Sequence, residues 1–285
     1  MFYPKLALVA GVFALTSAVV SARDWNTEAR EPLHYSFSKD TALDVDNVNG
    51  EIRITGDGGN TIRVEGERVT HARDKQAIDR AKKDVTLDVN ERDGTAQLYV
   101  NGPFRGNNGR WSDYHGFHSH YDGDEYEVEY NFNIHVPRET VLQLRTVNGS
   151  IRTDQTSGKF DISGVNGGVE MLEASGSGRV NMVNGRMEVS FRENPKAETE
   201  FHSVNGAIEA TFPSNFAADL VLKTLNGQAY TDFDATALAN AFSQDRRGRF
   251  VYRPDRNARV RIGSGGPEVR FQTVNGDIRI KKGTK

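Results

Sequence analysis

The sequence predicts an all-β protein, specifically a coiled β-solenoid-like repeat domain with one or two short covering helices. The chain of 285 residues contains 28 glycines and only 8 prolines, a composition that suits many short strands joined by tight turns. The tripeptide [Val/Leu]-Asn-Gly occurs seven times, and apolar and polar residues alternate as the chain approaches each copy, as in half-buried strands. The asparagines and glycines of these motifs are Asn49 and Gly50, Asn148 and Gly149, Asn166 and Gly167, Asn184 and Gly185, Asn205 and Gly206, Asn226 and Gly227, and Asn275 and Gly276.

The spacing of the motif indicates a stacked repeat. From Val147 to Leu225 successive copies are separated by 18 or 21 residues, a step typical of one solenoid rung. Apolar residues stand three positions before and four positions after each motif's Val or Leu, as Val45 and Ile52 do around the first copy. Each motif therefore reads as a strand, a corner and a second strand.

Stacked antiparallel hairpins are the alternative, because Asn-Gly is also the strongest signal for a two-residue hairpin loop. A hairpin would leave the motif's Val or Leu outside the core, although that position is apolar in all seven copies. A corner that turns this side chain inward explains the pattern better. In the coiled form, the asparagine amides would lie above one another and could hydrogen-bond along the stack. Each glycine would hold a positive φ or let neighbouring rungs approach closely.

Two segments interrupt the repeat. Residues 73–84 place Ala77, Ile78 and Ala81 on one face among charges, which predicts a short amphipathic helix, and two alternating strands follow around the turn Asp93-Gly94. Residues 235–242 are a second candidate helix. We expect these segments to cover the open ends of the sheet, since an exposed edge invites aggregation.

The amino terminus has the features of a signal peptide, assigned to residues 1–22. Lys5 precedes an apolar stretch, and small residues surround Ala22, after which cleavage is expected. An uncleaved membrane anchor is the alternative, but the stretch is shorter than the roughly 20 residues that a spanning helix needs. The mature chain, residues 23–285, is expected to form a single domain without a transmembrane segment. The chain contains no cysteine, which excludes disulfides.

Several stretches carry a family resemblance: DVDNVNGEIRI, VPRETVLQLRTVNGSIRT and GGPEVRFQTVNGDIRI. Together with the interrupting helix and strand pair, they cover roughly residues 35–282 and resemble the bacterial putative-adhesin family, a domain of unknown function built of β-strand repeats. The resemblance implies a coiled β fold at the cell envelope, with no established catalytic residues. A Gly/His/Asp-rich insertion loop at residues 104–125 departs from the family pattern.

Two clusters are candidate binding sites. Within the insertion, His115, His118, His120 and Asp122 could bind a divalent transition metal, although a solvated loop is the simpler interpretation. Arg246, Arg247 and Arg249 could bind phosphates or carboxylates of an envelope glycan, or could belong to a solvated strand. Apart from that metal, no cofactor is expected.

These features favour an exported structural or binding module in the periplasm or on the outer cell surface. Its partner would be an envelope protein or a glycan, since the net charge of −3 gives no general attraction to nucleic acid. An envelope-associated sensor or accessory protein with a metal-binding histidine loop is the alternative. A polysaccharide-acting β-helix enzyme is less favoured, because nothing in the sequence singles out carboxylates and basic residues that would project together from neighbouring rungs. Serine elbows, phosphate-binding loops and dinucleotide fingerprints are also absent from the sequence.

Overall fold

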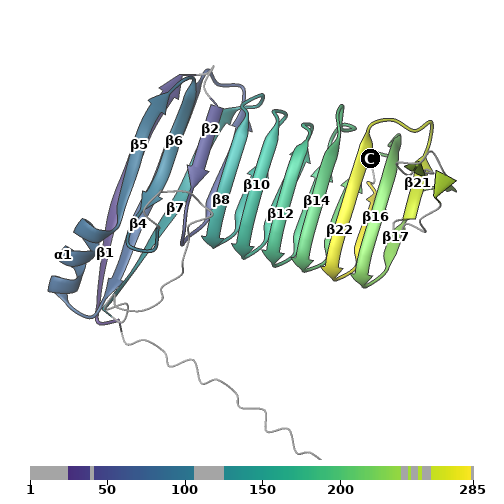
Figure 1. The fold of residues 1–285 in the computed structure, drawn as a ribbon. Coiled ribbons are helices and arrows are strands. Elements are labelled where there is room, and N and C mark those ends of the chain that lie inside the picture. The colour runs from purple at the N-terminus through teal and green to yellow at the C-terminus, as the bar shows by residue number, and fades with distance from the viewer. Residues whose placement is uncertain are drawn as a thin grey trace, which may run out of the picture.

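The computed structural model describes residues 25–38, 42–105, 125–238, 243–244, 250–251 and 258–283. Within these ranges the chain is nearly all strand, with a single α-helix, α1 (Lys75–Asp84), at one end (Figure 1). Two large mixed sheets lie face to face and enclose one continuous cluster of buried hydrophobic side chains. The all-β prediction is therefore confirmed.

The strands of each sheet are named here in spatial order. The first, sheet A, contains β1 (Thr27–Ser38), β4 (Thr61–Ala72), β7 (Tyr126–Pro137), β3 (Ile52–Asp57), β9 (Ile151–Asp154), β11 (Val169–Ala174), β13 (Met187–Phe191), β15 (Ile208–Phe212), β23 (Ile278–Lys282) and β17 (Ala229–Thr231). The second, sheet B, contains β18 (Ala235–Ala237), β21 (Ala258–Ile262), β16 (Ala218–Asn226), β22 (Glu268–Asn275), β14 (Thr199–Asn205), β12 (Gly178–Asn184), β10 (Phe160–Asn166), β8 (Leu142–Asn148), β2 (Ala42–Asp46), β6 (Thr95–Asn101) and β5 (Thr86–Arg92). A separate pair joins β19 (Ser243–Gln244) to β20 (Phe250–Val251).

Each Asn-Gly motif connects the two sheets. The strand before a motif lies in sheet B and the strand after it lies in sheet A. Strands from successive motifs pair in parallel, so that Val180 of β12 has Ile162 of β10 on one side and Phe201 of β14 on the other. The hairpin alternative is wrong for these motifs, because the two flanking strands never pair with each other.

The chain leaves the stack once near each end. After β3 it forms β4, α1, β5, β6 and β7 before returning to place β8 and β9 beside β2 and β3. Near the other end, β16 and β17 precede β22 and β23 in the sequence. In space, β22 lies between β14 and β16, and β23 lies between β15 and β17. Figure 1 shows the yellow β22 between the green strands β14 and β16. The spatial order of the rungs thus differs from their sequence order.

The prediction that the motif's Val or Leu faces inward holds for two copies and is wrong for two, while the other three copies are half-buried. Val48 and Val147 are buried, but Val183 is 37% exposed and Leu225 is 62% exposed. Strand alternation continues up to the motif, so the preceding residue, such as Met182 in β12, faces the core and the valine faces out. A β-branched side chain still suits this outward strand position.

The first predicted helix is confirmed as α1. Asp74 caps its amino terminus by accepting a hydrogen bond from the Ala77 backbone nitrogen at 2.9 Å, which satisfies one of the free helix donors. The side chain of Arg68 on β4 fastens the helix to sheet A, since it donates to the Ala81 carbonyl at 2.8 Å and pairs with Glu31 of β1 at 3.0 Å. The predicted strand pair is also present, as antiparallel β5 and β6.

The second predicted helix, at residues 235–242, is wrong where the structure describes it. Residues Ala235–Ala237 form β18, which pairs antiparallel with β21 at the edge of sheet B. The neighbouring strand provides hydrogen-bond partners for these backbone groups. A helix of only two turns is marginally stable by itself, because few hydrogen bonds compensate the cost of nucleating it. Residues 239–242 lie outside the described residues, as does the predicted signal peptide. In the described part of the chain, no helix has the length and apolar character needed to span a bilayer.

Candidate functional site

The seven motif asparagines form a continuous ladder along one corner of the molecule. Each side-chain amide in turn donates to the carbonyl oxygen of its neighbour, with N···O distances of 2.6–3.0 Å. In spatial order the ladder contains Asn49, Asn148, Asn166, Asn184, Asn205, Asn275 and Asn226. At one end Asn49 donates to the Val128 carbonyl at 3.3 Å. The amides bond mainly to one another, so the ladder has a structural role.

The motif glycines stack beside the asparagines with no room for a side chain. A Cβ atom on any of the seven would lie 1.5–2.4 Å from a backbone oxygen of the neighbouring segment. For six of them that oxygen belongs to the next motif glycine, and for Gly50 it belongs to Tyr130. Only Gly50, Gly167, Gly185 and Gly276 have φ in the left-handed region. Close approach is therefore the requirement that all seven share.

Replacing Asn184 with alanine should lower the free energy of unfolding by about 1 kcal/mol. This residue donates to Asn166 at 3.0 Å and accepts from Asn205 at 2.9 Å, and water can replace much of both bonds because the corner is exposed. Asn181→Ala is the matched control, since Asn181 lies on the same strand and its side chain has no hydrogen bond to the described chain. Urea denaturation of both variants measures the difference. Equal losses would contradict a stabilising ladder.

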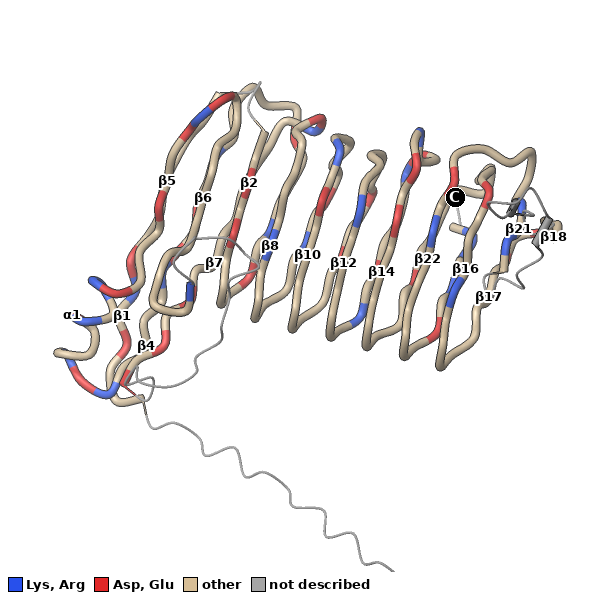
Figure 2. Tube along the Cα trace, in the orientation of Figure 1, with Lys and Arg blue, Asp and Glu red and all other residues tan. Residues whose placement is uncertain are grey.

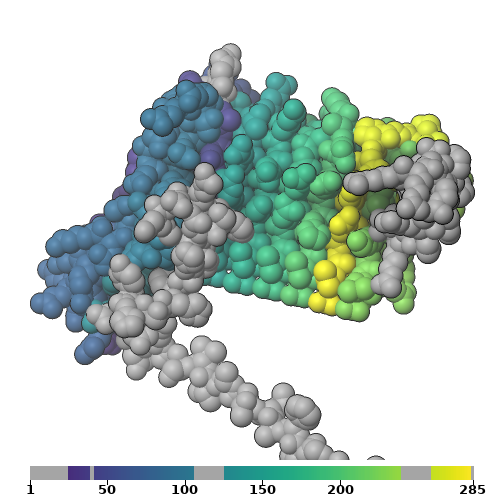
Figure 3. Space-filling view, in the orientation of Figure 1, coloured from purple at the N-terminus to yellow at the C-terminus, as the bar shows by residue number. Residues whose placement is uncertain are grey.

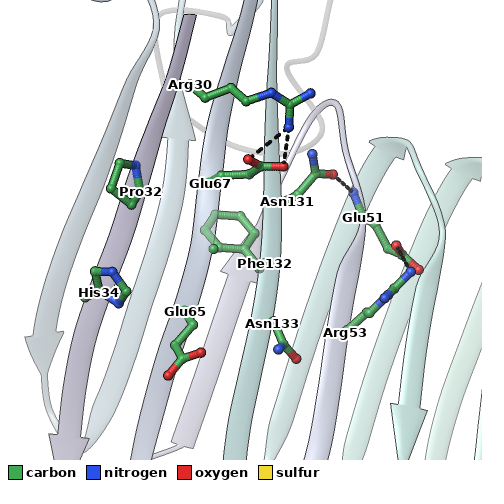
Figure 4. Close-up of a pocket in the computed structure, with 11 residues that line it drawn as sticks. Arg30, Pro32, His34, Glu51, Arg53, Glu65, Glu67, Asn131, Phe132 and Asn133 are labelled. Carbon is green, nitrogen blue, oxygen red and sulfur yellow. Dashed lines mark hydrogen bonds and ion pairs between the residues drawn. The ribbon is translucent and has the colours of Figure 1, made fainter.

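A groove of about 700 Å³ lies on the outer face of sheet A (Figure 4). Four neighbouring strands line it, and they come from three separate parts of the sequence. Its side chains are Arg30, Pro32 and His34 of β1, Glu65 and Glu67 of β4, Asn131 and Asn133 of β7, Arg53 of β3, and Glu51 just before β3.

Strand register aligns the groove's side chains in two rows across the sheet. In the first row Pro32 lies opposite Glu67, which lies opposite Asn131. The second row contains His34, Glu65, Asn133 and Arg53, each beside the next on a neighbouring strand. Alternate residues of a strand face the same side of the sheet, so the two rows are separated by two residues along each strand.

Ion pairs hold four of the groove's side chains in place. Arg30 pairs with Glu67 at 2.9 Å and with Glu28 at 2.6 Å, and these hydrogen bonds, the one to Glu28 foremost, raise the pKa of the arginine. Arg53 pairs with Glu51 at 2.7 Å, which likewise raises the pKa of Arg53. These pairs stand on the solvent side of the sheet, where each stabilises the fold only slightly. Their main effect is to orient the side chains.

Three polar side chains of the second row remain available. The Glu65 carboxylate, the His34 imidazole and the Asn133 amide have no hydrogen bond or ion pair with the described part of the chain. They combine a carboxylate that accepts, an imidazole ring and an amide that both donates and accepts. Such a set can bind a polar ligand laid across the strands.

The clusters singled out from the sequence lie elsewhere. His115, His118, His120 and Asp122 are outside the described residues, as are Arg246, Arg247 and Arg249. In the part of the chain that is described, no group of three or more His, Asp or Glu side chains is arranged to hold a metal ion. Sequence reasoning missed the groove because its residues are scattered over 104 positions of the chain, and only the outward alternation of β1 and β7 could have indicated it.

A buried ion pair lies where the insertion begins. Arg105 pairs with Asp46 at 2.8 Å, and their side chains are only 2% and 8% exposed. The Arg105 guanidinium also donates to the Val100 carbonyl at 3.0 Å and lies 4.5 Å from the centre of the Tyr99 ring. Burial raises the pKa of the Asp46 carboxyl, and the attraction of Arg105 opposes this without cancelling it. The pair fastens residues 102–105 over β2 and β6.

Comparison with known proteins gives structural likenesses at low identity. No protein-family model matches the chain, and no curated protein matches its sequence. The crystal structure of a putative cell adhesion protein from Clostridium sporogenes matches with a TM-score of 0.46 and 12% identity, covering 90% of this chain and 100% of that one. A putative adhesin from Bacteroides fragilis matches with a TM-score of 0.38 and 12% identity, covering 89% and 97% respectively. The role of this chain is therefore inferred from its own residues.

Proposed function

We propose that the protein is an exported, non-catalytic binding module of the cell envelope, and that the groove over β1, β4, β7 and β3 is its ligand site. The signal-peptide pattern of residues 1–22 supports export. The availability of Glu65, His34 and Asn133, beside side chains already oriented by ion pairs, is the observation that carries the proposal. The coiled stack of rungs serves as a rigid support for this surface.

A rigid sheet favours binding because its groups are ordered before the ligand arrives. Side-chain ordering on association opposes binding by roughly 0.5–1.5 kcal/mol for each immobilised side chain. In the groove, Arg30, Glu67, Glu51 and Arg53 are already held by their ion pairs. A ligand that contacts them loses less free energy to ordering.

The same pairing argues against glycosidase chemistry in the groove. Glycoside hydrolysis typically uses a protonated carboxylic acid and a second carboxylate on either side of the scissile bond. Glu51 and Glu67 are each engaged by an arginine, which leaves Glu65 alone among the groove's carboxylates. We therefore assign these groups to recognition.

The test compares two matched double variants of the mature chain, residues 23–285, for binding to immobilised envelope fractions of its native host. His34→Ala/Asn133→Ala removes groups from the groove, whereas His202→Ala/Asn181→Ala removes the same residue types from the outer face of sheet B. Biolayer interferometry should show at least a tenfold weaker apparent affinity for the first variant, about 1.4 kcal/mol, and no change for the second. Equal binding by both variants, or no binding by the wild type, would refute the assignment.

A further inference from the structure

A second depression continues the groove along sheet A. It has a volume of about 310 Å³ and lies over β9, β11 and β13, with Ser150 and Gly168 at its base. Glu51 stands on one side of it and Arg186 on the other. Because Glu51 also lines the larger groove, the two recesses adjoin and form one furrow.

The depression arises from a change of side-chain size at one repeated position. The residue after each motif glycine is Glu51 in the first rung, then Ser150, Gly168 and Arg186 in the next three. Two small residues between two long ones leave a recess on the face of the sheet. A Cβ on Gly168 would have only the Arg186 carbonyl oxygen nearby, at 3.3 Å. The backbone therefore leaves room for a side chain at this position, although the native residue has none.

The furrow crosses seven neighbouring strands, from β1 through β4, β7, β3, β9 and β11 to β13. At the usual strand spacing of about 4.8 Å this corresponds to a length of roughly 29 Å. It therefore suits an extended chain-like ligand that runs across the strands. An extended peptide would instead be expected to add to a free sheet edge.

The ion pairs of the furrow argue against a strongly charged polymer as its ligand. All four of its arginines are paired with glutamates. Arg152 pairs with Glu170 at 2.7 Å, and Arg186 pairs with Glu188 at 2.6 Å and with Glu209 at 2.9 Å. A polyanion would have to displace these carboxylates, and a polycation would have to displace the guanidinium groups everywhere except at Glu65. Figure 2 shows both signs interspersed along the strands of sheet B as well, and Figure 3 gives a space-filling view of the protein in the same orientation.

We infer that the furrow binds an uncharged glycan chain, an inference that rests on the proposed binding function. Each sugar hydroxyl both donates and accepts hydrogen bonds, which matches a surface where carboxylates, amides and guanidinium groups alternate. The groups recur at the strand spacing, which is close to the length of one sugar unit in an extended glycan. The ion pairs hold all four guanidinium groups and four of the five carboxylates in place, so Glu65 is the one furrow carboxylate without an arginine partner in the described part of the chain.

The experiment measures binding of the full mature chain to uncharged oligosaccharides from cellulose, mannan, xylan and chitin, with heparin and polygalacturonate as charged probes. Isothermal titration should show at least one uncharged oligosaccharide binding, more tightly as its length increases and with little change on adding salt. Ser150→Trp and Gly168→Gln should each weaken that binding at least tenfold by filling the depression. Ser163→Trp, the matched control on the outer face of sheet B, should bind like the wild type. Thermal unfolding confirms that each variant is folded.

Binding of the charged probes alone, with a strong salt dependence, would overturn the inference. Binding of no uncharged oligosaccharide, or equal binding by the wild type and both filling variants, would do the same. The envelope-binding test with His34→Ala/Asn133→Ala separates the two proposals. If that variant loses envelope binding while no uncharged glycan binds, the groove is a binding site for another ligand. If it binds envelope normally, both proposals fail.

Discussion

Replacing Gly185 with valine is expected to destabilise the protein by roughly 3 kcal/mol or more, the upper end of the range for a strained backbone. Its φ of +133° lies in the region that β-branched residues avoid, and a Cβ would lie 1.5 Å from the Gly167 carbonyl oxygen. The valine would have to distort its own backbone and also separate two rungs. Since a domain's total stability is about 5–15 kcal/mol, denaturant unfolding should register this as a large shift.

Three other glycines separate the effect of a left-handed backbone from the effect of close approach between rungs. Gly206→Val tests close approach alone, because φ there is not left-handed and the Cβ would lie 1.9 Å from the Gly185 oxygen. Gly94→Val tests backbone conformation alone, because φ is +71° and the surroundings are open. Gly58→Val tests neither, since nothing lies near its Cβ position and φ is not left-handed. Gly185 should be the most damaging and Gly58 the least. A Gly58 variant as unstable as the Gly185 variant would refute the stacked corner.

Replacing Arg105 with methionine should destabilise the protein by roughly 3–5 kcal/mol at neutral pH. The substitution leaves the buried Asp46 carboxylate without the guanidinium that lies 2.8 Å away in the native protein. Removing one partner of a buried pair is worse than removing both, because an uncompensated charge remains in a poorly solvated place. Chemical denaturation at pH 7 measures the loss.

The pH dependence and a double variant test the electrostatic cause. Burial already raises the pKa of Asp46, and losing Arg105 should raise it further. A carboxyl with a raised pKa binds its proton more tightly when folded, so its contribution to stability is greatest at low pH and is lost as the pH rises through the folded pKa. The deficit of Arg105→Met should therefore shrink as the pH falls toward the ordinary aspartate pKa of about 3.9. Asp46→Leu/Arg105→Met should recover much of the loss. If the loss of stability does not change with pH, or if the double variant is no more stable than Arg105→Met, the loss comes from packing and not from an unpaired charge.

The alternation and spacing of residues in the sequence predicted the β fold, the helix α1 and the strand pair β5 and β6. They also predicted that motif asparagines would lie above one another, and six amide-to-amide bonds join the seven side chains. If the alternation of inward and outward residues is continued into the motif, Val183 and Leu225 face solvent, as observed. The inward prediction was wrong for them because it placed the start of the corner one residue too early.

The sequence by itself determined the features that depend on near neighbours. The helix cap at Asp74, the alternating burial within each strand and the need for glycine where rungs stack all follow from a few consecutive residues repeated at regular steps. These interactions are short in range, so a local pattern contains the information that specifies them.

Only the tertiary structure decided which strands became neighbours. Each rung presents the same Asn-Gly corner, so the motif does not specify which rung lies beside which. The repeat pattern therefore does not predict that β22 and β23 lie between β14 and β15 on one side and β16 and β17 on the other. The groove depends on such a choice. Arg30, Glu65, Asn133 and Arg53 share one surface because β1, β4, β7 and β3 pair in that order, and this order is set by long-range packing at the end of the sheet, where local patterns carry no information about the partner strand.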